Sequence, residues 1–239
     1  MGAEDGVDAD PPLVVELFGQ PGAGKSTLAR FVAEGSELPT RAALSVAWKR
    51  QPKLSKAALL ARTLLDAPCL AAATKVALNG RLFSGDSLSR LVRLLIKSHW
   101  FRSQSGPFLL EEGHLQDLWS ILYSAGRREP DPRQLAPLIR CLYRGLDVQI
   151  VYLEVDPQSA FDRIRARTQG KSRLDRLSQE ELRSELIGHA DLPSRLVDAA
   201  RLAGLRVERL DASLPIETSA GQLREIMRRL GAPATKRRR

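Results

Sequence analysis

Short apolar runs alternate with longer segments of helical periodicity along this chain. The runs predict buried strands at 13–18, 42–48, 108–110, 148–155 and 206–210. Apolar residues at helical spacing predict helices over 28–34, 54–66, 86–101, 115–125, 157–168, 178–203 with a break near Pro193, and 216–230. Strands that alternate with helices are typical of a parallel sheet with helices on both faces. The pattern therefore predicts an α/β domain.

The residues directly behind the first apolar run form a complete phosphate-binding loop. They match GxxxxGK[ST] and a following threonine: Gly19, Gln20, Pro21, Gly22, Ala23, Gly24, Lys25, Ser26 and Thr27. Glycines let backbone N–H groups approach a polyphosphate, and the next helix directs the positive end of its dipole at the anion. We expect Lys25 to reach the β- and γ-phosphates and Ser26 to bind Mg²⁺. The loop predicts a nucleoside triphosphate site.

Composition and organisation indicate one globular domain. The 239 residues are 43% hydrophobic and 27% charged, which suits a single domain over 13–231. We expect 1–12 to be a disordered leader and 232–239 a basic disordered tail. No apolar run approaches the ~20 residues that cross a bilayer, and the acidic start is unlike a signal peptide. We therefore expect a cytoplasmic protein without a membrane partner.

The net charge of +9 has two readings, a nucleic-acid surface or a pocket that collects phosphates. Much of the charge is local, at the tail and within 163–176, so we do not expect a nucleic-acid partner. Cys69 and Cys141 lack metal-binding spacing and are expected to be core thiols in a reducing compartment.

Two carboxylates, Glu111 and Glu112, stand at the end of the short run 108–110. In phosphate-loop proteins a carboxylate at a strand end holds the Mg²⁺ shell or positions the attacking group. Successive strand residues point to opposite faces, so one of the two should face the phosphates. We expect Glu112 to be the catalytic and Mg²⁺-binding residue and Glu111 to lie on the acceptor side. The alternative is two charges at an exposed loop start. His114 and Trp119 are expected to be packing residues.

A cluster of basic residues follows the fourth predicted strand: Arg163, Arg165, Arg167, Lys171, Arg173 and Arg176. On a helix, Arg163 and Arg167 would lie side by side, where like charges repel unless an anion is bound. Arginines on a closing lid stabilise a transferring phosphoryl group and exclude water. We expect an arginine-rich lid with Arg163 and Arg167 as catalytic phosphate contacts. A solvated face is the alternative.

The phosphate loop, the stretch 151–157 (VYLEVDP) and the segments 163–167 (RIRAR) and 174–177 (LDRL) together resemble the nucleoside monophosphate kinases, and most of all the thymidylate kinase branch. The resemblance spans most of the chain. It implies a three-layer P-loop NTPase fold with a parallel five-stranded sheet, an arginine-rich lid, and an enzyme that uses ATP and Mg²⁺ to phosphorylate a nucleotide. Arg50 falls where that family binds the acceptor phosphate, which implies an acceptor-binding role. Relatives in this branch commonly pair, which implies a homodimer.

The acceptor half departs from that family. Pro21 stands where an acidic residue is usual, Phe18 where a glutamate is, and 111–114 (EEGH) replaces an Asp-Arg-Tyr. The carboxylate pair is also similar to the Glu-Arg-Ser of deoxynucleoside kinases. The sequence thus predicts an ATP-dependent kinase of a small acceptor, a nucleoside monophosphate on the main hypothesis. A kinase of a nucleoside or sugar, and a P-loop ATPase or nucleotide-binding regulator, are the alternatives.

Overall fold

The computed structural model describes residues 11–34, 47–48, 50–104, 106–127, 129–167 and 173–231. The expected leader up to residue 10 and the expected tail lie outside these ranges, so neither prediction is tested. Most of the predicted strand 42–48 also lies outside them, and its last two residues, Ala47 and Trp48, are helical rather than extended.

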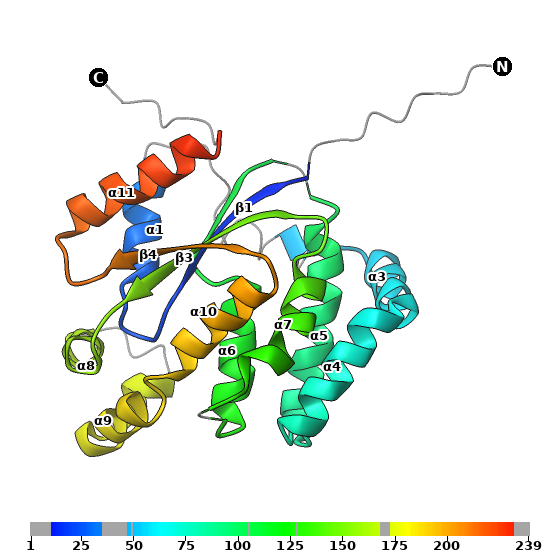
Figure 1. The fold of residues 1–239 in the computed structure, drawn as a ribbon, viewed down its shortest axis with the longest axis horizontal. Coiled ribbons are helices and arrows are strands. Elements are labelled where there is room, and N and C mark those ends of the chain that lie inside the picture. The colour runs from blue at the N-terminus through cyan, green and yellow to red at the C-terminus, as the bar shows by residue number, and fades with distance from the viewer. Residues whose placement is uncertain are drawn as a thin grey trace.

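The described strands form one parallel sheet in the order β2-β1-β3-β4 (Figure 1). They are β1 (Leu13–Phe18), β2 (Phe108–Leu110), β3 (Asp147–Glu154) and β4 (Arg206–Asp211). Strand β1 pairs with β3 along its whole length and with β2 from Val14 to Glu16. The described sheet therefore has 4 strands where five were expected, because the region of the missing strand is helical at its end and otherwise outside the described ranges.

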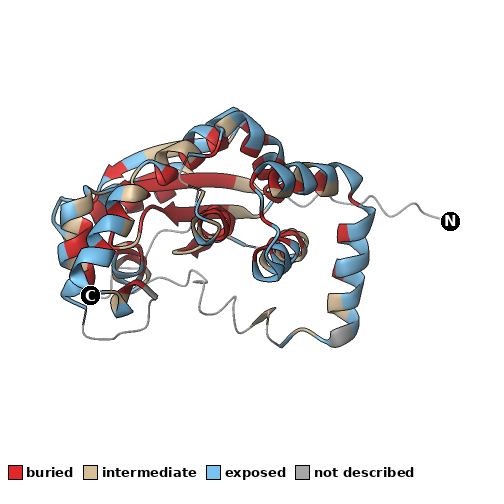
Figure 2. Ribbon diagram, turned by 90° about the horizontal axis from the view of Figure 1, so that it is seen from below, coloured by how far each residue is buried: buried red, intermediate tan, exposed pale blue. Residues whose placement is uncertain are grey.

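Helices cover both faces of this sheet, and Figure 2 shows the buried strands between helices whose outer sides are exposed. Helices α1 (Lys25–Ala33) and α11 (Ile216–Arg229) pack on the face that carries Val15 and Leu17. The opposite face, with Val14 and Phe18, meets a larger set of helices. That set is α4 (Ala67–Asn79), α5 (Gly85–Phe101), α6 (His114–Ser124), α7 (Pro132–Leu142) and α10 (Leu192–Leu202). The alternation of side chains along β1 thus serves two cores.

Three further helices and a 3₁₀ turn complete the described fold. Helix α3 (Lys53–Leu65) contacts α5, while α8 (Pro157–Arg165) and α9 (Gln179–Gly188) pack on each other and on the 3₁₀ turn η1 (Arg173–Arg176). The helix expected over 178–203 is two helices, because the chain turns at 189–191 and Pro193 lies in the first turn of α10. The helix expected over 157–168 ends earlier, at Arg165.

Helices α4 and α7 were not predicted. The start of α7 follows from local chemistry, since Asp131 accepts a hydrogen bond from the Arg133 backbone N–H at 2.9 Å and Pro132 occupies the first turn. Pro137 inside the helix obscured its periodicity. The two cysteines are core thiols, as expected, because Cys69 on α4 and Cys141 on α7 are free and buried.

No single helix in the described ranges is long and apolar enough to cross a bilayer. Helices α3 and α4 reach the length and apolar composition of a membrane span only when they are taken together, and their axes are bent by 79° with respect to each other.

Candidate functional site

The phosphate-binding loop joins β1 to α1 and is closed against the backbone of its neighbours. Gly22 and Gly24 have φ values of +88° and +89°, a left-handed conformation that favours glycine. A Cβ added at Gly22 would stand 2.6 Å from the Ala160 carbonyl oxygen of α8. A Cβ at Gly19 would meet the Leu153 carbonyl oxygen of β3 at 2.6 Å. No side chain fits at these points unless the loop moves.

Lys25 begins α1 and folds back into the loop. Its Nζ donates hydrogen bonds to the carbonyl oxygens of Gly19, at 2.6 Å, and Gln20, at 3.1 Å. Burial, together with the charge of Arg167, lowers the pKa of Lys25 to about 7, while the charge of Glu111 acts in the opposite direction. A buried ammonium held inside a glycine loop is placed to meet an anion.

Of the other loop residues, Gln20 is bonded to the neighbouring backbone, whereas Ser26 and Thr27 are exposed. Gln20 turns its side chain toward the end of β3, where Nε2 donates to the Val155 carbonyl oxygen at 2.9 Å. Pro21 lies beside it, against α6 and α9. Ser26 and Thr27 are exposed in the first turn of α1. Their hydroxyls are therefore accessible at the positive end of a helix.

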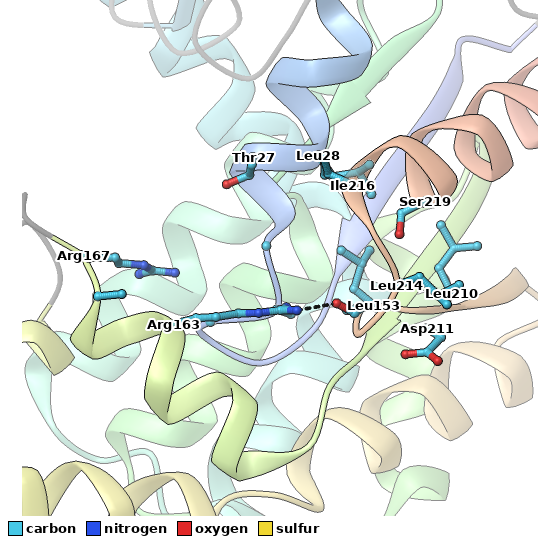
Figure 3. Close-up of a pocket in the computed structure, with 15 residues that line it drawn as sticks. Thr27, Leu28, Leu153, Arg163, Arg167, Leu210, Asp211, Leu214, Ile216 and Ser219 are labelled. Atoms are coloured by element: carbon cyan, nitrogen blue, oxygen red, sulfur yellow. Dashed lines mark hydrogen bonds between the residues drawn. The ribbon is translucent and has the colours of Figure 1, made fainter.

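A cleft of about 400 Å³ opens beside the loop (Figure 3). Its walls come from the loop and start of α1, the end of β3, the end of α8 with the residues after it, and the chain from the end of β4 into α11. The lining residues are Gly22, Ala23, Gly24, Thr27, Leu28, Leu153, Arg163, Ala166, Arg167, Leu210, Asp211, Ala212, Leu214, Ile216 and Ser219. A concave site with apolar walls and a few charged groups is typical of a small-molecule site.

Two arginines bring positive charge to this cleft. Arg163 points from α8 across to the segment after β4, where Nη2 donates to the Ala212 carbonyl oxygen at 2.6 Å (Figure 3). Arg167 lies beyond the end of α8 and also lines the cleft. The structure thus brings both predicted phosphate contacts to the loop. The reason differs from the one expected, because the helix ends before Arg167 and the two do not share a helical face.

Two other arginines of the basic cluster do not line this cleft. Arg165 and Arg176 are exposed and are not among the residues that line the cleft. Lys171 lies outside the described residues, and the side chain of Arg173 is not described. The closing lid therefore stays a prediction.

The predicted carboxylates follow β2 as expected, and both are half-buried. Of the two, Glu111 is the one whose charge acts on Lys25. The catalytic and Mg²⁺-binding role of Glu112 stays a prediction. Arg50, the predicted acceptor residue, is exposed and does not line the cleft.

Sequence reasoning missed Glu16, which lies fully buried within β1. Its Oε1 accepts hydrogen bonds from the backbone N–H groups of Leu115, at 3.0 Å, and Gln116, at 3.2 Å. Its Oε2 accepts the Tyr143 hydroxyl at 2.6 Å. Burial raises the pKa of Glu16 to about 7, although the hydrogen bonds from Tyr143 and Gln116 oppose the shift. A charged residue inside an apolar strand was the one signal that could have marked it.

His114 and Trp119 lie on α6 as packing residues. The His114 ring is buried between Phe101, at 5.0 Å, and Tyr143, at 5.3 Å between ring centroids. Burial holds the pKa of His114 well below its usual value. Trp119 stacks on Tyr123 with a centroid separation of 4.8 Å.

Comparison with known proteins found likenesses among solved structures. No family model matches the chain, and no curated protein matches it. The deoxyadenosine kinase of M. mycoides with the products dCMP and dCDP superposes with a TM-score of 0.49 at 14% identity, covering 91% of this chain and 99% of that chain. The same kinase with dATP gives 0.48 at 15% identity over 92% and 100%, and with dCTP 0.44 at 14% over 91% and 98%. These values assign neither a family nor a substrate, so the thymidylate kinase resemblance stays a hypothesis.

The conformation of Gly22 generates a prediction about the loop. The substitution Gly22→Ala should lower the free energy of unfolding by about 1–3 kcal/mol, because the Cβ meets the Ala160 carbonyl in a left-handed residue. Binding of nucleoside triphosphates should weaken as well. The control is Gly221→Ala in α11, where a Cβ has open space and should stabilise the helix. Equal effects of the two changes, in chemical denaturation, would contradict this.

The ionisation of Glu16 generates a second prediction. The folded protein keeps this proton up to about pH 7, whereas the unfolded chain releases it near the ordinary value of 4.5. The free energy of unfolding should therefore fall as pH rises through this window, by on the order of 1–3 kcal/mol from this group. Glu16→Gln cannot ionise and should lack this part of the decline. Urea denaturation from about pH 4.5 to about pH 8 measures it, and parallel curves for the two proteins would rule it out.

Proposed function

We propose that this protein is an ATP-dependent kinase that transfers a γ-phosphoryl group to a small acceptor. The observation that carries the proposal is the meeting of Lys25, Arg163, Arg167 and Glu111 around a glycine loop beside a cleft. Phosphoryl transfer is catalysed mainly by positioning and by stabilising charge on the transferring group. Cations around a phosphate loop with one carboxylate nearby suit that chemistry.

Each group has a role in the proposed reaction. The loop amides and Lys25 hold the β- and γ-phosphates, and the cleft beside them takes the rest of the ATP molecule. Arg163 and Arg167 neutralise charge that spreads over the transferring phosphoryl group. Arg163 is held by the Ala212 carbonyl, so its guanidinium is already oriented across the cleft. The remaining guanidinium N–H groups are donors for phosphate oxygens.

The donor set at this edge also fits Mg²⁺. The exposed Ser26 hydroxyl and a carboxylate from the end of β2 are hard oxygen ligands, the type that Mg²⁺ prefers alongside phosphate oxygens and water. Ser26 and Glu112 are the residues that would hold it. When bound, the ion offsets negative charge on the phosphates.

The acceptor has two candidate classes. The sequence resemblance favours a nucleoside monophosphate, but the acceptor-phosphate residue it implies, Arg50, is exposed and away from the cleft. A strand-end carboxylate whose charge acts on Lys25 favours an acceptor hydroxyl, because Glu111 would then serve as the base that takes the proton of that hydroxyl. A nucleoside or sugar is therefore the second candidate, and the carboxylate supports it. A homodimer and a cytoplasmic location belong to the same proposal.

The alternative to a kinase is a protein of another functional class, a P-loop ATPase or nucleotide-binding regulator. A hydrolase would release ADP from ATP at an equal rate with and without added acceptor. A kinase would release ADP when its acceptor is present. A screen of nucleoside monophosphates, nucleosides and sugars for acceptor-dependent ADP release decides between these classes, and an acceptor-independent rate would overturn the kinase proposal.

Removal of the loop lysine tests the donor site. Lys25→Met should reduce acceptor-dependent ADP release by about 10²–10³-fold, because it removes a preorganised charge at the phosphates. Coupled assay of ADP release measures it. A variant with an undiminished rate would contradict the assignment of Lys25.

The arginines allow a matched comparison on one helix. Arg163→Ala should reduce kcat by about 10-fold or more, because it removes a guanidinium from the cleft, whereas Arg165→Ala changes an exposed arginine outside it. Steady-state kinetics of both variants measures the difference. Equal losses would mean that general charge, rather than contact in the cleft, determines the effect.

A further inference from the structure

Glu16 lies outside the cleft but touches the segment that carries the strand-end glutamates. It is paired in register with Leu110, the last residue of β2, and Glu111 is the next residue of that chain segment. Three residues further along the chain, directly after β1, Gly19 opens the phosphate loop. Glu16 is therefore close along the chain to the donor loop, and it pairs with the residue that precedes the strand-end carboxylates.

The start of α6 lacks a local cap, and Glu16 supplies one from β1. The N-cap position is Gly113, and no side-chain cap from that position is present. The next backbone donors, at Leu115 and Gln116, have no acceptor within the helix. Both N–H groups donate to Oε1 of Glu16 instead, at 3.0 and 3.2 Å. A side chain from strand β1 thus caps helix α6, a role that a Ser, Asp or Asn at the N-cap position usually has.

Two further contacts hold this carboxylate in one position. The Tyr143 hydroxyl, at the end of α7, donates to Oε2 at 2.6 Å and accepts from the Leu115 backbone N–H at 2.8 Å. The space beside Gly113 is closed, because an added Cβ would stand 2.0 Å from Oε2. The backbone between Glu112 and α6 is therefore packed directly onto Glu16.

We propose that Glu16 is a positioning residue, which fixes the 111–113 segment through the start of α6 and so sets where the strand-end carboxylates lie relative to Lys25. This inference rests on the proposed kinase function for its catalytic consequence. Its structural part does not. Burying polar groups costs free energy unless each group has a hydrogen-bond partner. Here the Glu16 carboxylate accepts from three donors, which are the backbone N–H groups of Leu115 and Gln116 and the Tyr143 hydroxyl.

Amide hydrogen exchange tests the structural part without any substrate. Glu16→Met keeps the length of the side chain and removes the acceptors, so the amides of 111–116 should exchange about 10-fold faster or more, the loss expected for one hydrogen bond. Glu16→Gln retains one acceptor oxygen and should restore most of the protection. Gln149→Met, another buried polar residue changed to an apolar one but on β3, is the matched control and should leave this segment unchanged. Unchanged exchange in Glu16→Met, or faster exchange at 115 and 116 alone, overturns the proposal.

Kinetics on the same variants tests the catalytic part. Glu16→Met should lower kcat by about 10-fold or more and leave the KM for ATP within about 2-fold, because the loop that binds the donor keeps its own contacts. Glu16→Gln should recover most of kcat. If Glu16→Met does not fold, Tyr143→Phe replaces it. This variant removes the hydroxyl that donates to Glu16 Oε2, and it should lower kcat by less than Glu16→Met would. Faster exchange with an unchanged kcat would overturn the catalytic part. A wild-type protein with no transferase activity would instead refute the proposed function, while the exchange result still judges the role of Glu16.

Discussion

The pairing of β1 with strands on both sides is the constraint on which the rest of the structure depends. The phosphate loop leaves β1 directly after Phe18, whose partner in β3 is Tyr152, and β2 ends beside Glu16. Carboxyl ends of parallel strands meet at one edge of a sheet. The loop, the strand-end glutamates and α8 therefore reach the same place, although long stretches of sequence separate them. Movement of β1 along its neighbours would separate every group of the site.

Burial shifts the pKa values of two ionisable groups near this edge of the sheet, Lys25 and Glu16. It lowers the pKa of Lys25 and raises that of Glu16, in both cases to about 7, because it disfavours the charged form of each. Lys25 is buried inside the phosphate loop, where a bound anion would favour its charged form, whereas Glu16 is enclosed by protein donors. The same physical effect prepares one group for a ligand and makes the other part of the framework.

Much of the fold was predictable because its signals are local. The apolar runs of β1 and β3, the short β2 with its glutamates, and most helices follow from residues that are neighbours in the chain. The misses have physical reasons. Pro137 hid the periodicity of α7, and α8 ends before Arg167 although the helical spacing continued. The sequence predicted that Arg163 and Arg167 lie side by side on one helix. In the structure α8 ends before Arg167, and both side chains line the same cleft.

By itself the sequence determined the phosphate loop, since GxxxxGK[ST] depends on the conformational freedom of glycine and on a helix that begins at a fixed spacing. It also determined the layered parallel architecture through its alternating periodicities. Only the tertiary structure decided which carboxylate acts on Lys25, that Arg163 is held by Ala212, and that Glu16 caps a helix 99 residues away. Those contacts join segments remote in sequence, and their distances depend on how strands and helices pack, which no local pattern encodes.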